Sequence, residues 1–227
     1  IERASELLPR ILAPRRLNFK QSTRGLYLIL FGLFKKIAIA DSIAKSVNSI
    51  YEVSGQQVSW LDIVLATFLF AIQIYCDFSG YSDIARGVSK LFGIELMRNF
   101  NVPYFSQSPS EFWRRWHISL STWLRDYLYI PLGGNRRGNV YRNLMITMVL
   151  GGLWHGAGWN FVLWGFYQGA LLCIYRFGSK AFSSSSIKLF PSSWSTAKSL
   201  LSTVVFFIFT CYGWLLFRAN SFEQIAT

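Results

Sequence analysis

The chain contains two histidines, and each follows a tryptophan. His155 lies in residues 152–157, Gly-Leu-Trp-His-Gly-Ala, at the end of an apolar run, and His117 follows Trp116 in a segment rich in arginine and tryptophan. An ionisable side chain in or near hydrocarbon is costly and usually has a function. Burial lowers the pKa of an imidazole and keeps it neutral, so it can act as a general base near neutral pH.

Such a base could take the proton of an alcohol while the alcohol oxygen attacks an ester or thioester carbonyl. Positioned proton transfer of this kind accelerates a reaction by about 10²–10⁴-fold. Glycines on both sides of His155 would allow a substrate to approach closely. The residues permit this chemistry, and composition alone does not select it.

Several other chemistries are excluded by missing motifs. The chain has no His-Glu-x-x-His or Cys-x-x-Cys pattern, so no metal site is predicted. It has no Gly-x-Ser-x-Gly turn, which residues 77–83 resemble only loosely, and no phosphate-binding glycine loop. The three cysteines, Cys76, Cys173 and Cys211, are scattered in or beside apolar runs, which is typical of small buried side chains.

The elements that must position the histidines are predicted to be membrane helices. The chain is 52% hydrophobic and only 15% charged, whereas about 25% charged residues is usual in soluble domains. Residues 58–76 and 199–217 are apolar runs that approach the ~20 residues needed to cross a bilayer. We therefore predict an all-α, polytopic integral membrane protein whose surroundings are the lipid bilayer.

The net charge of +12 lies mainly between the apolar runs. Orientation in the membrane explains this placement more simply than nucleic-acid binding, which we do not expect. The positive-inside tendency predicts that residues 1–25, 77–139 and 178–198 are cytoplasmic. The turn at residues 156–159 would then face outward or dip into the membrane from outside.

Two further segments lead to local predictions. The run at residues 26–40 is interrupted by Lys35 and Lys36, which predicts an interfacial or tilted helix whose lysines reach an interface. Ser108 followed by a proline and a first-turn carboxylate predicts a helix start. The apolar spacing that follows predicts one amphipathic helix through Tyr127, with His117 at the border of its aromatic stripe.

Five blocks together carry a resemblance to a known family. They are residues 77–83 (Asp-Phe-Ser-Gly-Tyr-Ser-Asp), 99–104 (Asn-Phe-Asn-Val-Pro-Tyr), 111–127 with its Trp-His pair, 129–134 (Tyr-Ile-Pro-Leu-Gly-Gly) and 152–157. In this order and spacing they resemble the membrane-bound O-acyltransferase superfamily, in particular its bacterial alginate O-acetyltransferase branch. The resemblance implies helices around a funnel and tunnel that reach an intramembrane active site.

The resemblance also implies roles and surroundings. The position of His155 is that of the principal catalytic residue, and the position of His117 is that of a second site residue. A multi-pass protein of the bacterial inner membrane would pass an acetyl group to an exported polysaccharide such as alginate, with periplasmic partner proteins. The donor would be acetyl-coenzyme A or a carrier-linked acyl thioester, with no bound cofactor. Residues 1–227 would form one membrane-embedded domain fragment that lacks the N-terminal spans and the extreme C-terminus.

Further residues are candidates for binding the substrate or acyl donor. Their alternative roles are helix packing for the tryptophans, anchoring at the headgroup level for the arginines, and pairing with buried arginines for the aspartates. The candidates are Trp154, Trp113, Trp116, Arg114, Arg115, Arg125, Asp77 and Asp83.

Three alternative functions remain at this point. The first is transfer of D-alanyl or another acyl group to a cell-envelope polymer. The second is a proton-coupled transporter in which His155 relays protons, although the spans hold few polar residues besides Asp62, Gln73 and Gln168. The third is a membrane scaffold, which would leave the Trp-His pairs unexplained. Proton-linked solute uptake into vesicles would distinguish a transporter from an acyltransferase.

Overall fold

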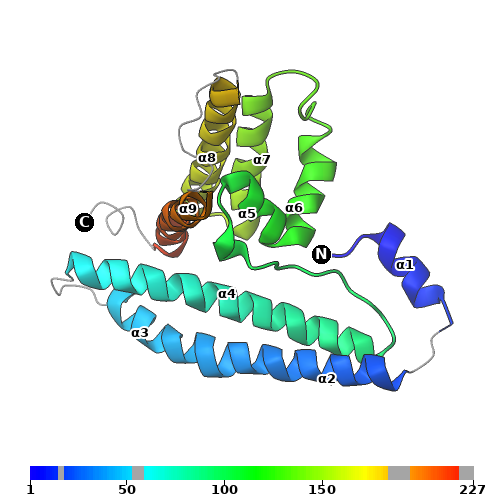
Figure 1. The fold of residues 1–227 in the computed structure, drawn as a ribbon. Helices are drawn as coiled ribbons and strands as arrows, with labels where there is room; N and C mark the ends of the chain where they lie inside the picture. Colours follow the sequence, from blue (N-terminus) through cyan, green and yellow to red (C-terminus); the bar gives the residue numbers. More distant parts are fainter. Residues whose placement is uncertain (15–17, 53–58, 184–194, 220–227) are drawn as a thin grey trace. The chain divides into compact units, whose positions relative to one another are not determined.

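The computed structural model describes residues 1–14, 18–52, 59–183 and 195–219 (Figure 1). Helices and their connections make up all of these residues, which confirms the prediction of an all-α chain. The chain divides into two compact units, Ile1–Phe100 and Asn101–Thr227, and each is considered by itself. One membrane-embedded domain over residues 1–227 stays a prediction.

The first unit is built on a pair of long helices, α2 and α4, that lie side by side (Figure 1). Helix α1 spans Ala4–Leu12, and α2 spans Phe19–Leu33. The π-helical segment η1, Phe34–Ala40, continues α2 into α3, Asp41–Tyr51. Helix α4 spans Trp60–Leu91. The predicted interfacial helix at residues 26–40 is thus the middle of a longer helical run.

Helix α4 begins at a capping box and is longer than the apolar run that predicted it. The Ser59 side chain accepts hydrogen bonds from the first-turn backbone, and the Asp62 carboxylate accepts one from the Ser59 N–H. The helix runs beyond residue 76 to Leu91 and includes the polar block at residues 77–83. Part of the stretch assigned to the cytoplasm is therefore the continuation of a membrane-length helix.

Two glycine pairs bring α2 and α4 into backbone contact. A Cβ atom added to Gly32 would lie 2.6 Å from the Gly80 carbonyl oxygen, and one added to Gly87 would lie 2.5 Å from the Gly25 carbonyl oxygen. Backbone contact this close is possible only without side chains, as in small-residue packing of membrane helices. The two contacts are seven residues apart on each helix, so they fix both the separation and the register.

The second unit contains both histidines. Its short elements are η2 (Pro103–Phe105), α5 (Pro109–Arg115), α6 (Ile118–Leu124) and the π-helical η3 (Arg125–Tyr129). Three longer helices follow, α7 (Val140–His155), α8 (Trp159–Ser183) and α9 (Ser195–Arg218). In Figure 1, α7 and α8 lie side by side and are joined by the short turn that follows His155.

The predicted helix start is confirmed, but the single amphipathic helix after it is wrong. The Ser108 side chain accepts a hydrogen bond from the Glu111 N–H at the start of α5. The helix then ends at Arg115, because Trp116 is extended and His117 adopts a left-handed conformation before α6 begins. His117 therefore lies at a break between two helices, and its side chain is buried rather than at the border of a stripe.

Two of the described helices, Trp60–Leu91 and residues Thr196–Arg218 of α9, are long and apolar enough to cross a membrane. They coincide with the runs at residues 58–76 and 199–217, so both predicted spans are helices of sufficient length. The runs at residues 141–155 and 161–177 are also helical, as α7 and α8.

Candidate functional site

The position of His155 depends on close contact between α7 and α8. A Cβ atom added to Gly152 would lie 2.2 Å from the Phe161 carbonyl oxygen, and one added to Gly165 would lie 2.5 Å from the Met148 carbonyl oxygen. The glycines thus let the two backbones touch close to the turn. Since α7 ends at His155, its imidazole is held against the first turns of α8.

The imidazole of His155 is surrounded by aromatic rings. Its centroid lies 5.0 Å from that of Trp154, 5.2 Å from Trp164 and 5.3 Å from Phe217, and all three rings are nearly perpendicular to it. Phe161 stacks at 6.5 Å. Among the described residues, His155 makes no hydrogen bond or ion pair, so ring packing alone sets its orientation.

His117 is held by a strained backbone. Its φ of 41° and ψ of 55° lie in the left-handed region, which costs a side-chain-bearing residue about 1–2 kcal/mol. The Ser121 hydroxyl donates to the Trp116 carbonyl oxygen at 3.0 Å, and the Ser121 N–H donates to the His117 carbonyl oxygen at 2.9 Å. Outliers of this kind cluster at functional sites.

The two histidines meet at one tryptophan. The Trp154 ring lies 6.0 Å from that of His117 and 5.0 Å from that of His155. Burial, and then the nearby His155, lower the pKa of His117 to about 3, so this imidazole is neutral at physiological pH. Trp154 itself is 54% exposed, which leaves one side of the histidine pair open within this unit.

The predicted tryptophans Trp113 and Trp116 belong to the same aromatic cluster. Trp113 contacts Trp164, the neighbour of His155, at 5.9 Å. Trp116 contacts Trp214 of α9 at 4.8 Å. Both tryptophans therefore connect the helix break at His117 to the helices around His155, and this packing coexists with the binding role predicted for them.

Helix α9 contributes two site residues that the sequence analysis missed. Trp214 contacts Trp116, and Phe217, one turn further on, contacts His155. Two aromatic residues three positions apart at the end of the last apolar run could have indicated a buried face of that helix. That run was interpreted only as a membrane span, because a span is apolar on every face and its pattern selects no buried side.

The three predicted arginines differ in their surroundings. Arg115 pairs with Glu111 at 2.6 Å within α5, and Arg125 pairs with Asp126 at 2.6 Å. Arg114 is exposed. An arginine paired with a carboxylate one turn away keeps free donors on its planar fork. Phosphate binding by these side chains stays a prediction.

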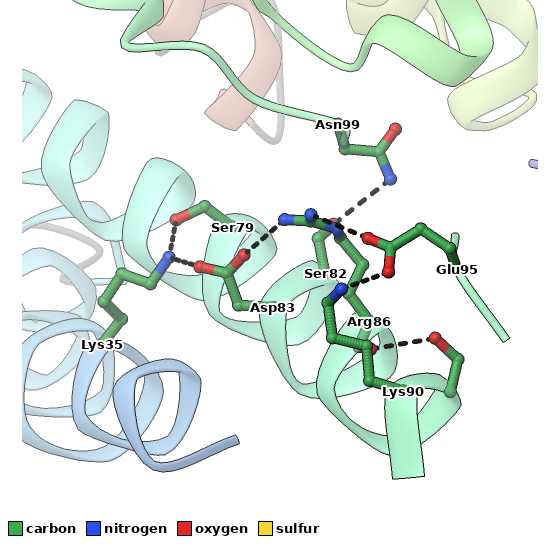
Figure 2. Close-up of polar contacts among 9 residues, drawn as sticks. Lys35, Ser79, Ser82, Asp83, Arg86, Lys90, Glu95 and Asn99 are labelled. Carbon is green, nitrogen blue, oxygen red and sulfur yellow. Dashed lines mark hydrogen bonds and ion pairs between the residues drawn. The ribbon is translucent and has the colours of Figure 1, made fainter. Parts of the chain in front are cut away.

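The predicted aspartates lie on α4 in the first unit, and Asp83 belongs to a network of charges (Figure 2). Asp83 accepts a hydrogen bond from Lys35 at 2.6 Å and lies 3.5 Å from Arg86, while Lys35 also donates to Ser79 at 3.0 Å. Asp77 pairs with Lys36 at 2.8 Å. Of the two aspartates, Asp83 has the expected arginine partner, and each has a lysine partner.

The prediction that Lys35 reaches an interface is wrong. Its side chain is buried at 8% exposure, because Asp83 and Ser79 on α4 supply acceptors for the ammonium group. A buried charge persists only with such compensation. Arg86 and Lys90 extend the network to Glu95, which follows α4 (Figure 2).

The arrangement around Trp154 suits proton transfer within an aromatic cluster that is open on one side. Two imidazoles meet at the Trp154 ring, and aromatic rings surround His155. A neutral imidazole there can accept a proton from a hydroxyl group. The cluster contains no feature that selects a particular acceptor.

Comparison with known proteins gives the family. The sequence model of the membrane-bound O-acyltransferase family matches residues 8–222. The chain belongs to this family. Membership confirms the resemblance found in the sequence and the membrane-bound character of the protein.

Individual relatives are similar over most of this chain. The chain is 45% identical over 194 residues to the probable alginate O-acetylase AlgI of Azotobacter vinelandii, covering 85% of this chain and 36% of that protein. It is 39% identical to the peptidoglycan O-acetyltransferase of Helicobacter pylori, covering 97% of this chain and 41% of that protein. The teichoic acid D-alanyltransferase of Bacillus subtilis is 29% identical over 88% of this chain and 52% of its own length. The chain thus spans about two fifths of the first two relatives.

Proposed function

We propose that this chain carries the histidine site of a membrane enzyme that transfers an acetyl or other short acyl group. The acceptor is a hydroxyl group of an exported polysaccharide such as alginate, or a periplasmic protein that relays the acyl group. The observation that carries the proposal is the meeting of His117 and His155 at Trp154 inside an aromatic cluster. Family membership and relatives named as O-acetylases support it.

His155 is the proposed general base. It takes the proton of the acceptor hydroxyl while the hydroxyl oxygen attacks the acyl carbonyl carbon. The bond from that carbon to the donor sulfur breaks, and the proton passes on to the leaving sulfur. His117 is neutral and buried, so it positions the acyl group or relays the proton. The acyl donor is acetyl-coenzyme A or a carrier-linked thioester, and no bound cofactor takes part.

The surroundings follow from the family and from the charge pattern. The helices would surround a funnel and tunnel within a multi-pass protein of the bacterial inner membrane. The donor would bind on the cytoplasmic side, where Arg114, Arg115 and Arg125 can contact its phosphates. Transfer would proceed towards the outer face and the periplasmic partner proteins.

Transfer of a D-alanyl group to an envelope polymer is the second candidate. It is favoured by the similarity to the teichoic acid D-alanyltransferase over 88% of this chain. The same base would serve an aminoacyl thioester, since the attacked carbonyl and the leaving sulfur are equivalent. The two candidates differ in the donor, so the comparison of labelled acetyl and D-alanyl thioesters separates them.

The test is acyl transfer in membranes that contain the protein, with labelled acetyl-coenzyme A and the exopolysaccharide of its host. Wild type is compared with His155→Ala and His117→Ala, each inserted to the same level. We expect His155→Ala to lose about 10²-fold or more of the transfer rate, because it removes the proton acceptor. His117→Ala should lose less.

Ser179→Ala is the matched control, because Ser179 is an exposed α8 residue whose side chain donates within its own helix. It should transfer like wild type. Unchanged transfer by a well-inserted His155→Ala variant would refute the assignment of the base. Proton-linked solute uptake by the same membranes would favour the transporter instead.

A further inference from the structure

Phe217 is fixed beside His155 from two directions. Its ring lies 5.3 Å from His155, 5.3 Å from Trp164 and 5.1 Å from Phe161. Its carbonyl oxygen accepts a hydrogen bond from the Asn160 side chain at 3.4 Å. Asn160 is in the first turn of α8, so this bond ties the end of α9 to the turn that follows His155.

A base in this position must become positively charged during the reaction. Among the described residues, no carboxylate hydrogen bonds or pairs with His155. Its neighbours are the rings of Trp154, Trp164 and Phe217, each within 5.3 Å and nearly perpendicular. The face of an aromatic ring is negative and attracts a cation, more strongly where water is excluded.

We propose that Phe217 is a positioning residue of the acyl transfer, which orients the His155 ring and stabilises its transient imidazolium form through the face of the phenyl ring. The inference rests on the proposed function. The imidazole gains the hydroxyl proton as the new carbon–oxygen bond forms. It returns to neutral when the proton passes to the sulfur released by carbon–sulfur cleavage. Phe217 thus acts in the interval when His155 is charged.

Phe217 is chosen over the other rings around His155 because it lies on a different helix, α9. Trp154 and Trp164 lie on α7 and α8, which already contact each other at Gly152 and Gly165. Phe217 is the ring on His155 that comes from α9. Its loss would therefore leave the glycine contacts between α7 and α8 in place, while it removes a ring from His155 and from the aromatic residues around it.

The test replaces Phe217 with mono-, di- and trifluorinated phenylalanines, which keep the shape of the ring and progressively weaken its negative face. The measurement is kcat and KM for acetyl transfer by the whole protein in membranes. We expect kcat to fall stepwise, by about two- to thirtyfold across the series, because cation–π contacts have this range of strength. KM for the donor should stay constant, since the charge develops after binding.

Two conventional variants extend the series. Phe217→Tyr keeps the ring and should retain most of kcat, whereas Phe217→Leu fills similar volume without a ring and should lose at least as much as the trifluoro variant. A wild-type kcat in Phe217→Leu would overturn the proposal, since a side chain of similar volume without a ring would then support acetyl transfer.

The matched control applies the same fluorinated series at Phe209, which is 47% exposed on the same helix. There we expect no trend, and an equal trend at both positions would overturn the proposal. If kcat stays constant across the fluorinated series at Phe217 while His155→Ala abolishes transfer, this inference is overturned and the proposed base is not. Full activity of His155→Ala would instead remove the proposed base, and this inference with it.

Discussion

His117 occupies a conformation that glycine would adopt more readily, in a buried position between two short helices. The strain is compensated by its neighbours, since Ser121 donates hydrogen bonds to the carbonyl oxygens on both sides of the break. Backbone outliers of this kind occur often at functional sites, which is consistent with the role proposed for the imidazole. Its contact with the ring of Trp154 gives a reason, because the same ring contacts His155.

The buried state of His117 predicts a dependence of stability on pH. Its pKa is lowered by burial and by His155 to about 3, whereas an unfolded histidine titrates near 6.5. Below pH ~6.5 the unfolded chain binds a proton that the folded chain does not, so stability falls as the pH drops. We expect the melting temperature in detergent to decrease more steeply between pH 7 and 5 for wild type than for His117→Asn.

Asparagine is the suitable replacement because it tolerates the left-handed conformation and does not titrate. Parallel melting curves for wild type and variant over this range would contradict the assignment of a neutral, buried imidazole. Comparison of these curves with the rate of acetyl transfer at pH 5 separates loss of fold from protonation of the site.

At the scale of elements, local signals predicted helix starts better than helix breaks. The Ser108 cap and the apolar runs predicted the start of α5 and the positions of α4 and α9. The break at His117 was not predictable, since the aromatic spacing continues through it and α6 resumes the same pattern. Besides the Ser121 hydrogen bonds, the break is packed against α9, where Trp116 contacts Trp214.

The two histidines of the candidate site could be predicted from the sequence, but most of the rings around them could not. The Trp-His pairs and the resemblance to a known family identified His117 and His155. Spacing along the chain does not reveal which helix supplies the remaining rings. Phe161, Trp164 and Phe217 reach His155 through contacts between helices. The lysine partner of Asp83 was likewise set by the contact between η1 and α4, which the charge pattern does not specify.

The contact between α7 and α8 gives a prediction at this scale. In Gly152→Ala the added methyl group would meet the Phe161 carbonyl oxygen, a backbone atom that cannot rotate away. The helices must separate, so we expect a loss of acetyl transfer of at least tenfold, because small displacements of a catalytic group are costly. The measurement is transfer rate per inserted protein.

Gly178→Ala is the matched control, since nothing lies within 4 Å of the added methyl group on α8. It should transfer acetyl groups like wild type. Wild-type activity in Gly152→Ala would show that the site does not depend on this close contact.

At the scale of the whole molecule, the charge distribution predicts orientation. The loop before α7 is exposed and contains Arg136 and Arg137, within the basic stretch at residues 77–139. The positive-inside tendency predicts that this loop faces the cytoplasm. We expect Arg136→Cys to react with a membrane-impermeant thiol reagent in inside-out vesicles and not in intact cells with a permeable outer membrane.

The parent protein is the control, because its three cysteines are buried or half-buried. Labelling of Arg136→Cys in the intact cells would reverse the orientation.

The glycine contacts between α2 and α4 restrict which substitutions this interface can accept during evolution. Gly25 meets Gly87 and Gly32 meets Gly80, so the smallest residue is already present on both sides of each contact. In most helix pairs a larger side chain on one partner can be offset by a smaller one opposite, which lets an interface drift through paired substitutions. Here no smaller residue exists to offset an enlargement, so second-site suppressors of a Gly32→Ala defect have to arise away from the facing glycine.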